Sequence, residues 1–529
     1  MKRVLIISYY WPPTGGSGVQ RWVKFAKYLP SEGWQPVVYT PENPEMLAVD
    51  HSLEAEIPAE VEVLKTHITE PYELYRRLGR LFSPFSHHEG PSSSCHPEQS
   101  SSLCHPEQSS SICLSEHPSS SCPAERPSSS CHPERPQGVE GSSQTGLACN
   151  GAQKEVNPIN SQKKSLGQKL SMWIRGNLFI PDPRCMWIGP SVKYLKKYLA
   201  EHPVDVIVST GPPQSMHLIA RKLHLATGIP WIADFRDPWT KMFYFKHLSL
   251  SKFSEWRHGR LEKKVLDDAT VVVAVSPLVQ QDFQAMTDTP VELITNGYDE
   301  SDFALAGQSG IPDTDSSIEH DNLPTDSSER TVRLPEVAAV EKPQTFTVVH
   351  TGLFANDGNP EILWHALAEK CSAEPGFASA LRIRLAGKTD VEIIDSIVAA
   401  GLGDKLTDLG YKAHKEVVAL QQSADLLMLP LRKEPEYKAT LPGKLFEYLA
   451  ARKPILGIGQ TDGAMAQILA TTSSGVVFDW NDAASVRRYI DLCYENKLRG
   501  LPTIIPHDLE QYSRRGLTRR LVLLMNSLV

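Results

Sequence analysis

Residues 424–458 read ADLLMLPLRKEPEYKATLPGKLFEYLAARKPILGI, and this stretch holds a complete strand–helix–strand pattern. The apolar run at residues 424–429 is short enough for a buried strand. A loop that ends in Pro442 and Gly443 then leads into a helix-forming segment, and residues 454–458 predict a second strand after a short turn. Strands joined through a helix pair in parallel, so this stretch indicates an α/β fold.

Short β-branched runs alternate with helix-period segments through the rest of the chain as well. In its first part, the predicted strands lie at residues 4–8, 36–39, 204–209, 231–234, 270–275 and 291–294. In its second part, they lie at residues 345–350, 382–386, 424–429, 454–458 and 475–478. Two such sets predict two Rossmann-like domains with a cleft between them. Ligands should bind at the carboxyl ends of the strands, facing that cleft.

Composition and charge argue against two classes of protein. The 529 residues carry 54 Lys and Arg against 62 Asp and Glu, a net charge of -8, which argues against a nucleic-acid binder. No apolar run approaches the roughly 18 residues that a membrane span needs, so an integral membrane protein is not expected. The apolar run after Met1-Lys2-Arg3 ends at residues 8–13, which is too short for a signal peptide. We therefore expect a cytoplasmic protein.

One segment interrupts the alternation within the first domain. Residues 86–167 are rich in Ser and Pro, and five cysteines recur there every nine residues: Cys95, Cys104, Cys113, Cys122 and Cys131. Histidines follow some of these cysteines, so metal binding is one interpretation, but the paired Cys-x-x-Cys spacing of structural zinc sites is missing. Repeats without apolar periodicity cannot bury a core, and we predict a disordered insertion.

A second polar segment, residues 306–342, predicts a flexible linker because Asp, Ser, Pro and Glu dominate it. Its Asp313-Thr314-Asp315 sequence has a metal-binding form but no flanking strand, so we assign no metal to it. The predicted parts of the chain are a first domain at residues 1–305, the linker, a second domain at residues 343–508 and a terminal helix at residues 509–529.

Three loops after predicted strands of the first domain contain candidate site residues. Gly15 and Gly16 precede an amphipathic helix, where glycines let a ligand approach the backbone, although an ordinary tight turn is the alternative. His217 falls in the first turn of a helix after a strand and a glycine turn, where it either faces the cleft or packs locally. In Asp234-Phe235-Arg236-Asp237 a buried strand runs into three charges. Substrate contact is the favoured interpretation, and an internal Asp–Arg ion pair is the alternative.

The segment Pro442-Gly443-Lys444 opens the helix quoted above. A helix amino end binds phosphate through its free N–H groups, and Lys444 adds a positive charge there. Glu447, one turn further on, can accept hydrogen bonds from a ribose diol. The segment follows a strand that ends at residues 429–430, which places it at the predicted cleft.

Together these motifs resemble a retaining glycosyltransferase of family four, with the GT-B fold. The resemblance rests on the glycine loop after the first strand, the DFRDPW segment, an Asn296-Gly297 turn, the His350-Thr351-Gly352 strand end and the PGKLFEYL helix. More specifically, the chain resembles the bacterial enzymes of polysaccharide and glycolipid assembly. The resemblance covers the whole chain except the insertion and the linker.

The resemblance implies a nucleotide-sugar donor in the second domain. Lys444 would lie near the diphosphate, Glu447 would bind the ribose, and Gly352 would let the phosphates approach the backbone. No metal and no other cofactor is implied, because Lys444 and the helix amino end can stabilise the departing diphosphate.

For the first domain the resemblance implies the acceptor, a glycan or a lipid-linked saccharide. Gly15, Gly16 and Arg236 would line the acceptor side. The catalytic residues would be His217, Asp234 and Asp237.

Two departures from the family pattern keep alternatives open. The family's first glutamate would stand eight residues before Glu447, where this chain has Ala439, with Glu434 and Glu436 out of register. Residues 353–359 lack the expected basic residue, which leaves Lys388 as a substitute on the donor side. A non-catalytic nucleotide-sugar-binding partner of an assembly complex and a nucleotide-sugar epimerase of the same fold remain as alternatives.

Residues 241–264 mix basic and aromatic side chains. Such a segment either lies at an anionic membrane surface, where lipid-linked acceptors reside, or forms an ordinary solvated helix. The first interpretation places the protein at the inner face of the cytoplasmic membrane. Residues 509–528 resemble the terminal helix that, in this fold, crosses back onto the first domain.

Overall fold

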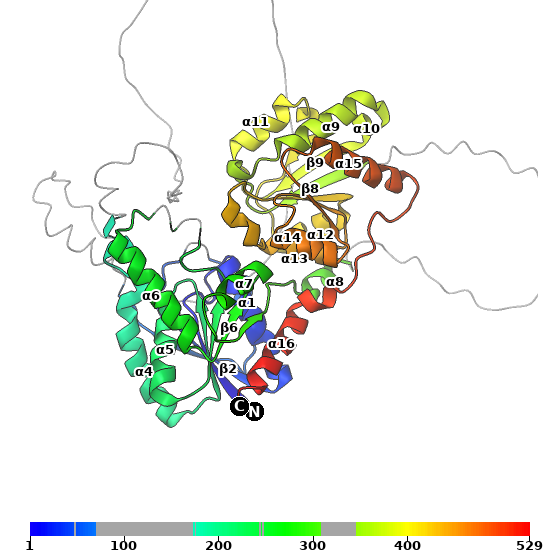
Figure 1. Cartoon of the computed structure of the whole chain (residues 1–529). Helices are drawn as coiled ribbons and strands as arrows, with labels where there is room; N and C mark the ends of the chain where they lie inside the picture. Colours follow the sequence, from blue (N-terminus) through cyan, green and yellow to red (C-terminus); the bar gives the residue numbers. More distant parts are fainter. Residues whose placement is uncertain (47–48, 70–172, 175, 243–244, 246–247, 308–344) are drawn as a thin grey trace, which may run out of the picture. The chain divides into compact units, whose positions relative to one another are not determined.

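The computed structural model describes residues 1–46, 49–69, 173–174, 176–242, 245, 248–307 and 345–529. They form two parallel sheets covered by helices, which confirms the predicted α/β class with two Rossmann-like domains (Figure 1). The predicted insertion at residues 86–167 and its cysteine repeats lie outside the described residues. So do residues 308–342 of the predicted linker, together with its Asp-x-Asp sequence.

The first sheet has the strand order β3-β2-β1-β4-β5-β6-β7, and its pairs are parallel. Its strands are β1 (Lys2–Ile7), β2 (Trp34–Pro41), β3 (Glu62–Thr66), β4 (Val206–Gly211), β5 (Trp231–Phe235), β6 (Val271–Ala274) and β7 (Val291–Leu293). The sequence did not predict β3, an edge strand whose side chains are only partly buried, so it lacks the apolar run that revealed the others.

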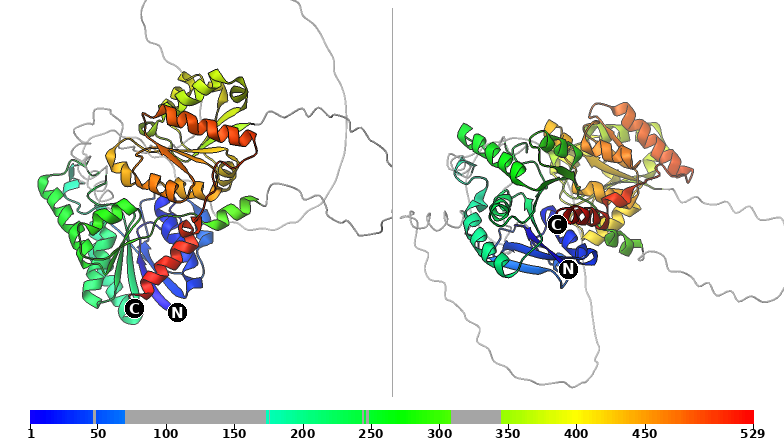
Figure 2. Two further views of the ribbon diagram at one scale, coloured as in Figure 1. Left: turned by 45° about the vertical axis from the view of Figure 1, so that its right-hand side comes forward. Right: turned by 60° about the horizontal axis from the view of Figure 1, so that its bottom comes forward.

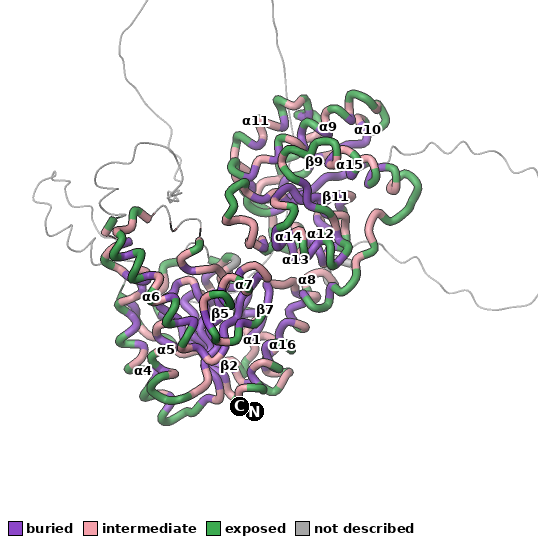
Figure 3. Tube along the Cα trace, viewed as in Figure 1, coloured by how far each residue is buried: buried purple, intermediate pink, exposed green. Residues whose placement is uncertain are grey.

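Helices cover both faces of this sheet (Figure 2). They are α1 (Ser17–Tyr28), α4 (Ile188–Glu201), α5 (Ser215–Thr227), α6 (Lys252–Asp268) and α7 (Pro277–Gln284), with short 3-10 turns η1 (Pro30–Glu32), η2 (His51–Glu56) and η3 (Pro183–Trp187). One apolar cluster lies between the sheet and α4 to α7, and a second lies under α1. The strands are therefore buried from both sides, as Figure 3 shows.

The second sheet has the order β10-β9-β8-β11-β12-β13, again with parallel pairs. Its strands are β8 (Phe346–Thr351), β9 (Leu381–Ala386), β10 (Leu406–Asp408), β11 (Leu426–Pro430), β12 (Ile455–Ile458) and β13 (Gly475–Phe478). Its helices are α9 (Glu361–Ala373), α10 (Pro375–Ala380), α11 (Val391–Ala399), α12 (His414–Ser423), α13 (Gly443–Ala451), α14 (Ala464–Thr471) and α15 (Ala483–Leu498), with 3-10 turns η5 (Asn356–Gly358), η6 (Gly403–Lys405) and η7 (Pro435–Ala439). The three-residue edge strand β10 was not predicted.

Strand order reverses at one point in each sheet. In the first sheet this point lies between β1 and β4, and in the second it lies between β8 and β11. Loops that leave neighbouring strands in opposite directions open a crevice there, which is where open α/β sheets bind ligands. The predicted site residues lie at the end of β5 or after β1, β4, β5, β8 and β9, and those of α13 follow the loop after β11.

Two segments cross between the sheets. After β7 comes α8 (Glu300–Gly307), whose last two residues fall inside the predicted linker. After the second sheet come η8 (Leu509–Tyr512) and α16 (Arg514–Asn526). Helix α16 lies against α1, and its Leu517 and Leu521 share an apolar cluster with Trp22 (Figure 2).

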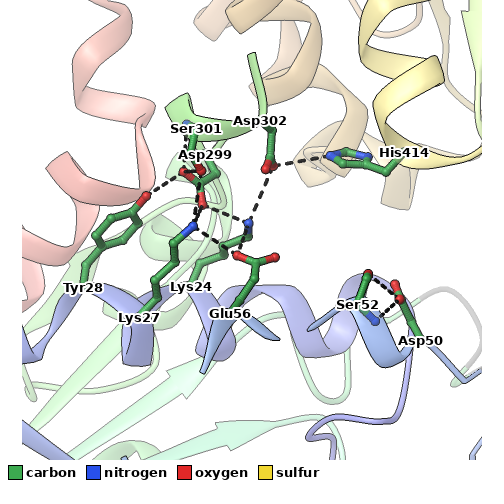
Figure 4. Close-up of polar contacts among 10 residues, drawn as sticks. All are labelled: Lys24, Lys27, Tyr28, Asp50, Ser52, Glu56, Asp299, Ser301, Asp302 and His414. Atoms are coloured by element: carbon green, nitrogen blue, oxygen red, sulfur yellow. Dashed lines mark hydrogen bonds and ion pairs between the residues drawn. The ribbon is translucent and has the colours of Figure 1, made fainter. Parts of the chain in front are cut away.

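An ion-pair network holds α8 beside α1 (Figure 4). Lys24 of α1 lies 2.6 Å from Glu56 and 2.9 Å from Asp299, whose side chain is only 1% exposed. From α8 itself, Asp302 contacts His414 of α12 at 3.3 Å. The crossing segment is therefore anchored to elements that precede it and to one that follows it.

Candidate functional site

The crevice of the second sheet begins at Gly352, directly after β8. Gly352 has a φ of 86° and Gly387 a φ of 130°, both in the left-handed region that side chains rarely adopt. The N–H of Gly352 donates to the carbonyl of Ala386 at 2.7 Å, and a Cβ on Gly387 would collide with the carbonyl oxygen of Gly352. Two glycines are thus required where the ends of β8 and β9 meet, and they leave backbone accessible to a ligand.

Lys444 reaches this crevice from the first turn of α13. Its Nζ lies 2.8 Å from the carbonyl oxygen of Leu353 and 2.9 Å from Nε2 of His350. A Cβ on Gly352 would stand 3.3 Å from Lys444 Cε, so the lysine stem passes beside the glycine, which stays exposed. Burial lowers the pKa of Lys444 to about 8, while Glu447 opposes that change. The ammonium is therefore partly dehydrated and close to its titration range at neutral pH.

Glu447 projects from the next turn of the same helix. The amide of Gln421, on α12, donates to Glu447 at 2.9 Å and to Thr351 Oγ1 at 3.0 Å. Gln421 is fully buried and ties α12, β8 and α13 together. We did not predict Gln421, because a single glutamine in a helical segment carries no pattern.

Lys388 lies on the adjacent loop, after Gly387. Its side chain is exposed, and its backbone carbonyl accepts a hydrogen bond from the N–H of Phe354 at 2.9 Å. The loops after β8 and β9 are therefore fixed side by side. The structure brings Gly352, Lys444 and Glu447 together, with Lys388 on the neighbouring loop.

The corresponding crevice of the first sheet is built around Arg236. Its guanidinium donates to the carbonyl oxygens of Gly18, at 2.7 Å, and Pro212. Arg236, directly after β5, thus links the first turn of α1 to the loop after β4. Gly16, with a φ of 100°, is the residue before α1, and a Cβ there would meet no atom within 4 Å. Gly15 precedes it in the same loop and is partly buried.

Asp234 is fully enclosed. It forms an ion pair with Arg21 at 2.8 Å, both side chains being at most 2% exposed, and it accepts hydrogen bonds from Trp22 and Thr210 at 2.7 and 2.8 Å. Burial by itself raises the pKa of Asp234, but these partners hold it below the usual value. The geometry favours the alternative of an internal Asp–Arg ion pair, with Arg21 in place of the neighbouring Arg236. A catalytic role for Asp234 stays a prediction.

His217 is also fully buried. Its Nδ1 lies 2.8 Å from Ser209 Oγ, and its ring stacks on Phe235 with centroids 4.3 Å apart. Among the described residues, its Nε2 has no hydrogen-bond partner; it points at Gly211, where an added Cβ would collide with it. Burial lowers the pKa of His217 to about 3, so the ring is neutral at physiological pH. Its predicted catalytic role is likewise untested by the geometry.

Asp237 differs from both of these residues. It is only partly buried, and no other described side chain forms a hydrogen bond or ion pair with it. Burial raises the pKa of Asp237 to about 6, although Arg236 opposes the change. A carboxyl that titrates near neutral pH and has free lone pairs is suited to general acid or base chemistry.

A pocket of about 550 Å³ opens beside Asp237. The next residue, Pro238, lines it together with Lys241, and η7 contributes Glu436 and Ala439. Ala439 also packs against the apolar cluster of the first domain. The position where the family resemblance would place a glutamate therefore presents a methyl group to the pocket, and Glu436, out of register in sequence, lines the same space.

The described residues contain neither a metal-binding cluster nor a membrane-spanning helix. Across residues 1–69 and 173–529, apart from their undescribed positions, no three His, Cys, Asp or Glu side chains gather in a way that could hold a metal ion. In the same part of the chain, no helix combines the length and the apolar character that a membrane crossing requires.

Comparison with known proteins identifies both domains. A model described as Glycosyltransferase Family 4 matches residues 167–302, and one described as Glycosyl transferases group 1 matches residues 339–515. No curated protein matches the chain.

Two solved structures illustrate the shared fold. Sucrose-phosphate synthase from Thermosynechococcus elongatus is similar with a TM-score of 0.52 and 12% identity, over 100% of this chain and 99% of that one. The N-terminal domain of trehalose-6-phosphate phosphatase from Candida albicans is similar with a TM-score of 0.50 and 10% identity, over 100% and 97%. Because the two family matches together span more than half of its residues, the chain belongs to the family-4-like glycosyltransferases and is a glycosyltransferase with the GT-B fold.

Proposed function

We propose that the chain binds a nucleotide-sugar in its second domain and transfers the sugar, with retention of configuration, to a glycan or lipid-linked saccharide of the cell surface. The observation that carries this proposal is the convergence of Gly352, Lys444 and Glu447 at the strand-order reversal of the second sheet. A dehydrated ammonium, the amino end of α13 and backbone free of side chains suit a diphosphate. A carboxylate one turn further along the helix suits the hydroxyls of a ribose.

The reaction requires charge stabilisation more than a strong base. When the anomeric C–O bond breaks, negative charge develops on the departing diphosphate, and Lys444 with the N–H groups of α13 can neutralise it. The acceptor oxygen attacks from the same face, forming the new C–O bond, and its proton passes to an oxygen of the leaving phosphate. This sequence retains the configuration and needs no group beyond the chain and its two substrates.

The acceptor side is proposed at Asp237 and the adjoining pocket. The Asp237 carboxyl, which pairs with no other side chain among the described residues, can accept a hydrogen bond from the acceptor hydroxyl, and Lys241 lines the same space. Gly16 leaves the first turn of α1 open, and Arg236 fixes the loops that surround it. Asp237 is therefore the side chain of the first domain on which we base the acceptor position.

A membrane-facing surface is proposed on α6. Five exposed residues recur on one side of this helix, at helical spacing: Phe253, Trp256, Arg257, Arg260 and Lys264. The rings are 64% and 56% exposed, and the Arg260 guanidinium lies over Trp256 at 5.4 Å. Exposed aromatic rings among cations favour an anionic bilayer surface, where a lipid-linked acceptor lies. Lys241 is less suited to this contact because it pairs with Asp282 at 2.7 Å.

Vesicle co-sedimentation tests the α6 surface. We expect the chain to bind vesicles of phosphatidylcholine with phosphatidylglycerol at low salt, more weakly at high salt, and not vesicles of phosphatidylcholine alone. Replacing Arg257, Arg260 and Lys264 by Ala should reduce that binding. The matched control replaces Lys193, Lys196 and Lys197, exposed on α4, by Ala. Equal losses in the two triple variants would show that only net charge matters and would contradict a specific surface.

The donor assignment is tested by a thermal-shift screen with UDP, GDP, ADP, dTDP and their sugar conjugates, because a ligand that binds only the folded state raises the melting temperature. One conjugate should give a selective shift. Proton NMR of the product of transfer then reports the anomeric configuration. If no nucleotide raises the melting temperature, the proposed donor site is wrong. A product with inverted anomeric configuration would contradict the retaining step. Interconversion of the free nucleotide-sugar would identify the epimerase alternative.

A further inference from the structure

We propose that His350 is a positioning residue that holds Lys444 in place for the donor diphosphate by accepting a hydrogen bond from its ammonium. This inference rests on the proposed function and gives a role to His350, which the sequence analysis named only as part of a strand-end motif. His350 stands near the end of β8 and is 2% exposed.

The neighbouring strand fixes the tautomer of His350. Its Nδ1 lies 3.1 Å from the carbonyl oxygen of Met428, on β11. A carbonyl oxygen only accepts hydrogen bonds, so Nδ1 carries the hydrogen and Nε2 carries the lone pair. Nε2 lies 2.9 Å from Nζ of Lys444, which therefore donates to it. Because β11 lies beside β8 in the sheet, the His350 ring takes the tautomer whose Nε2 can accept a hydrogen bond from Lys444.

These contacts leave Lys444 one donor for a ligand. An ammonium has three N–H groups, and two of them are directed at His350 and the carbonyl of Leu353. The third is available in the crevice beside Gly352. An acceptor on each side fixes the lysine stem, so the rotamer entropy that a free lysine would lose on binding is already lost in the folded chain.

The charges around the pair support the same assignment. Burial, and then the charge of Lys444, hold the pKa of His350 well below its usual value, although the backbone carbonyls of Met428 and Leu353 oppose the change, so the ring stays neutral and keeps one lone pair. On Lys444, burial acts against the charged form and Glu447 acts in favour of it. Removing the acceptor at His350 would leave the ammonium with one fewer partner in a dehydrated place, and its pKa would fall further.

A purely structural role for His350 makes a different prediction. The ring packs against Phe354, with centroids 4.1 Å apart, so any replacement can loosen the loop. Loosening alone would lower stability and weaken binding equally at every pH. A positioning role also moves the pH at which donor binding is lost.

The experiment compares His350→Asn with His350→Gln. Asparagine keeps an amide near Met428 but is too short to reach Lys444, whereas the amide of glutamine extends as far as Nε2. The probe is the nucleoside diphosphate that the screen selects, titrated calorimetrically between about pH 6.5 and 9.5. In the native chain, affinity should fall as pH rises through about 8, where Lys444 loses its proton. In His350→Asn we expect affinity lower by roughly tenfold and a midpoint at lower pH, and in His350→Gln recovery of both. The control is His258→Asn, a buried histidine of the first domain bonded to Trp239.

Each outcome decides the inference. If His350→Asn binds with native affinity and an unchanged midpoint, the inference about His350 is wrong. The proposed donor site would still stand in that case if Lys444→Ala loses affinity for the nucleoside diphosphate. A native chain that binds no nucleoside diphosphate would remove both the proposed function and this inference. If His350→Asn does not fold, nitrogen-15 spectra of histidine-labelled native chain decide, since a His350 ring that carries its proton on Nε2 cannot accept from Lys444.

Discussion

The strand ends of the two sheets hold their charges in opposite ways. At the first sheet, Asp234 is enclosed with Arg21, and Arg21, Trp22 and Thr210 all donate to its carboxylate. At the second sheet, Lys444 is partly exposed and keeps one donor beyond its two contacts. The same topology therefore supports a saturated pair that fixes loops and an unsaturated cation that is suited to binding an anion.

The difference has an energetic basis. A buried ion pair gains little over an apolar core, yet losing one partner leaves the other charge buried and uncompensated. A partly buried cation with a free hydrogen-bond donor costs less free energy in the folded state. Binding an anion then offsets the free-energy cost of its dehydration. Replacing the acidic residue of the first group should thus act on folding, and replacing the cation of the second should act on binding.

The largest effect is expected for Asp234→Ala. Arg21 would remain buried without its carboxylate, and the free energy of unfolding should fall by about 3–5 kcal/mol in urea titrations followed by circular dichroism. The control is Asp282→Ala, whose partner Lys241 is 51% exposed; it should cost less than about 1 kcal/mol. Similar losses in the two variants would show that burial does not distinguish these pairs.

Lys444→Ala should have the opposite profile. Affinity for the nucleoside diphosphate is expected to fall roughly 10- to 100-fold because the charge-assisted contact is lost, with only a small change in melting temperature. Lys415→Ala, an exposed lysine on α12, serves as the matched control. A large loss of stability in Lys444→Ala with unchanged affinity would reverse the comparison between the two strand ends.

Asp237 sharpens the contrast within the first sheet. Its pKa is raised from 3.8 to about 6, so the folded chain holds this proton more tightly than the unfolded chain does. The free energy of unfolding of the native chain should therefore fall as the pH rises from about 4 to 6. At pH 7.5, Asp237→Asn should be more stable than the native chain by about 1 kcal/mol. If Asp237 contacts the acceptor, transfer should fall about 100-fold in the same variant. Urea unfolding and initial transfer rates give the two readouts, and unaltered transfer would remove Asp237 from the site.

The smallest effect is expected where α8 contacts α12. The contact with Asp302 raises the pKa of His414, the hydrogen bond being the largest cause. The contribution is present below the usual pKa of 6.5 and is lost as pH rises through the higher folded value. Because His414 is 50% exposed, His414→Ala should cost at most about 0.5 kcal/mol at pH 6 and nothing at pH 9. His507→Ala, an exposed histidine 3.9 Å from Asp508, is the control. A cost that persists at pH 9 would show that the contact is packing and not charge.

Local patterns predicted most of the fold but not the partners within the sites. Each apolar strand of the two sheets was found, whereas the edge strands β3 and β10 were missed because they lack a buried face. Asp234 was recognised as part of a charged strand end, yet its partner lies on α1, far away in the sequence, and the adjacent Arg236 bonds backbone carbonyls instead. No spacing rule connects such residues.

By itself, the sequence determined the elements, because apolar period, glycine position and proline at a helix start act over a few residues. It also placed Lys444 and Glu447 on one face of α13, since three positions make about one helical turn. Tertiary structure alone decided which charges are saturated. Whether a carboxylate meets Arg21 and Trp22, or a lysine meets His350 and one carbonyl, depends on which strands lie side by side and which helices cover their ends. Burial and hydrogen bonding are set by those long-range contacts, and they separate the group that holds the fold from the group proposed to bind the donor.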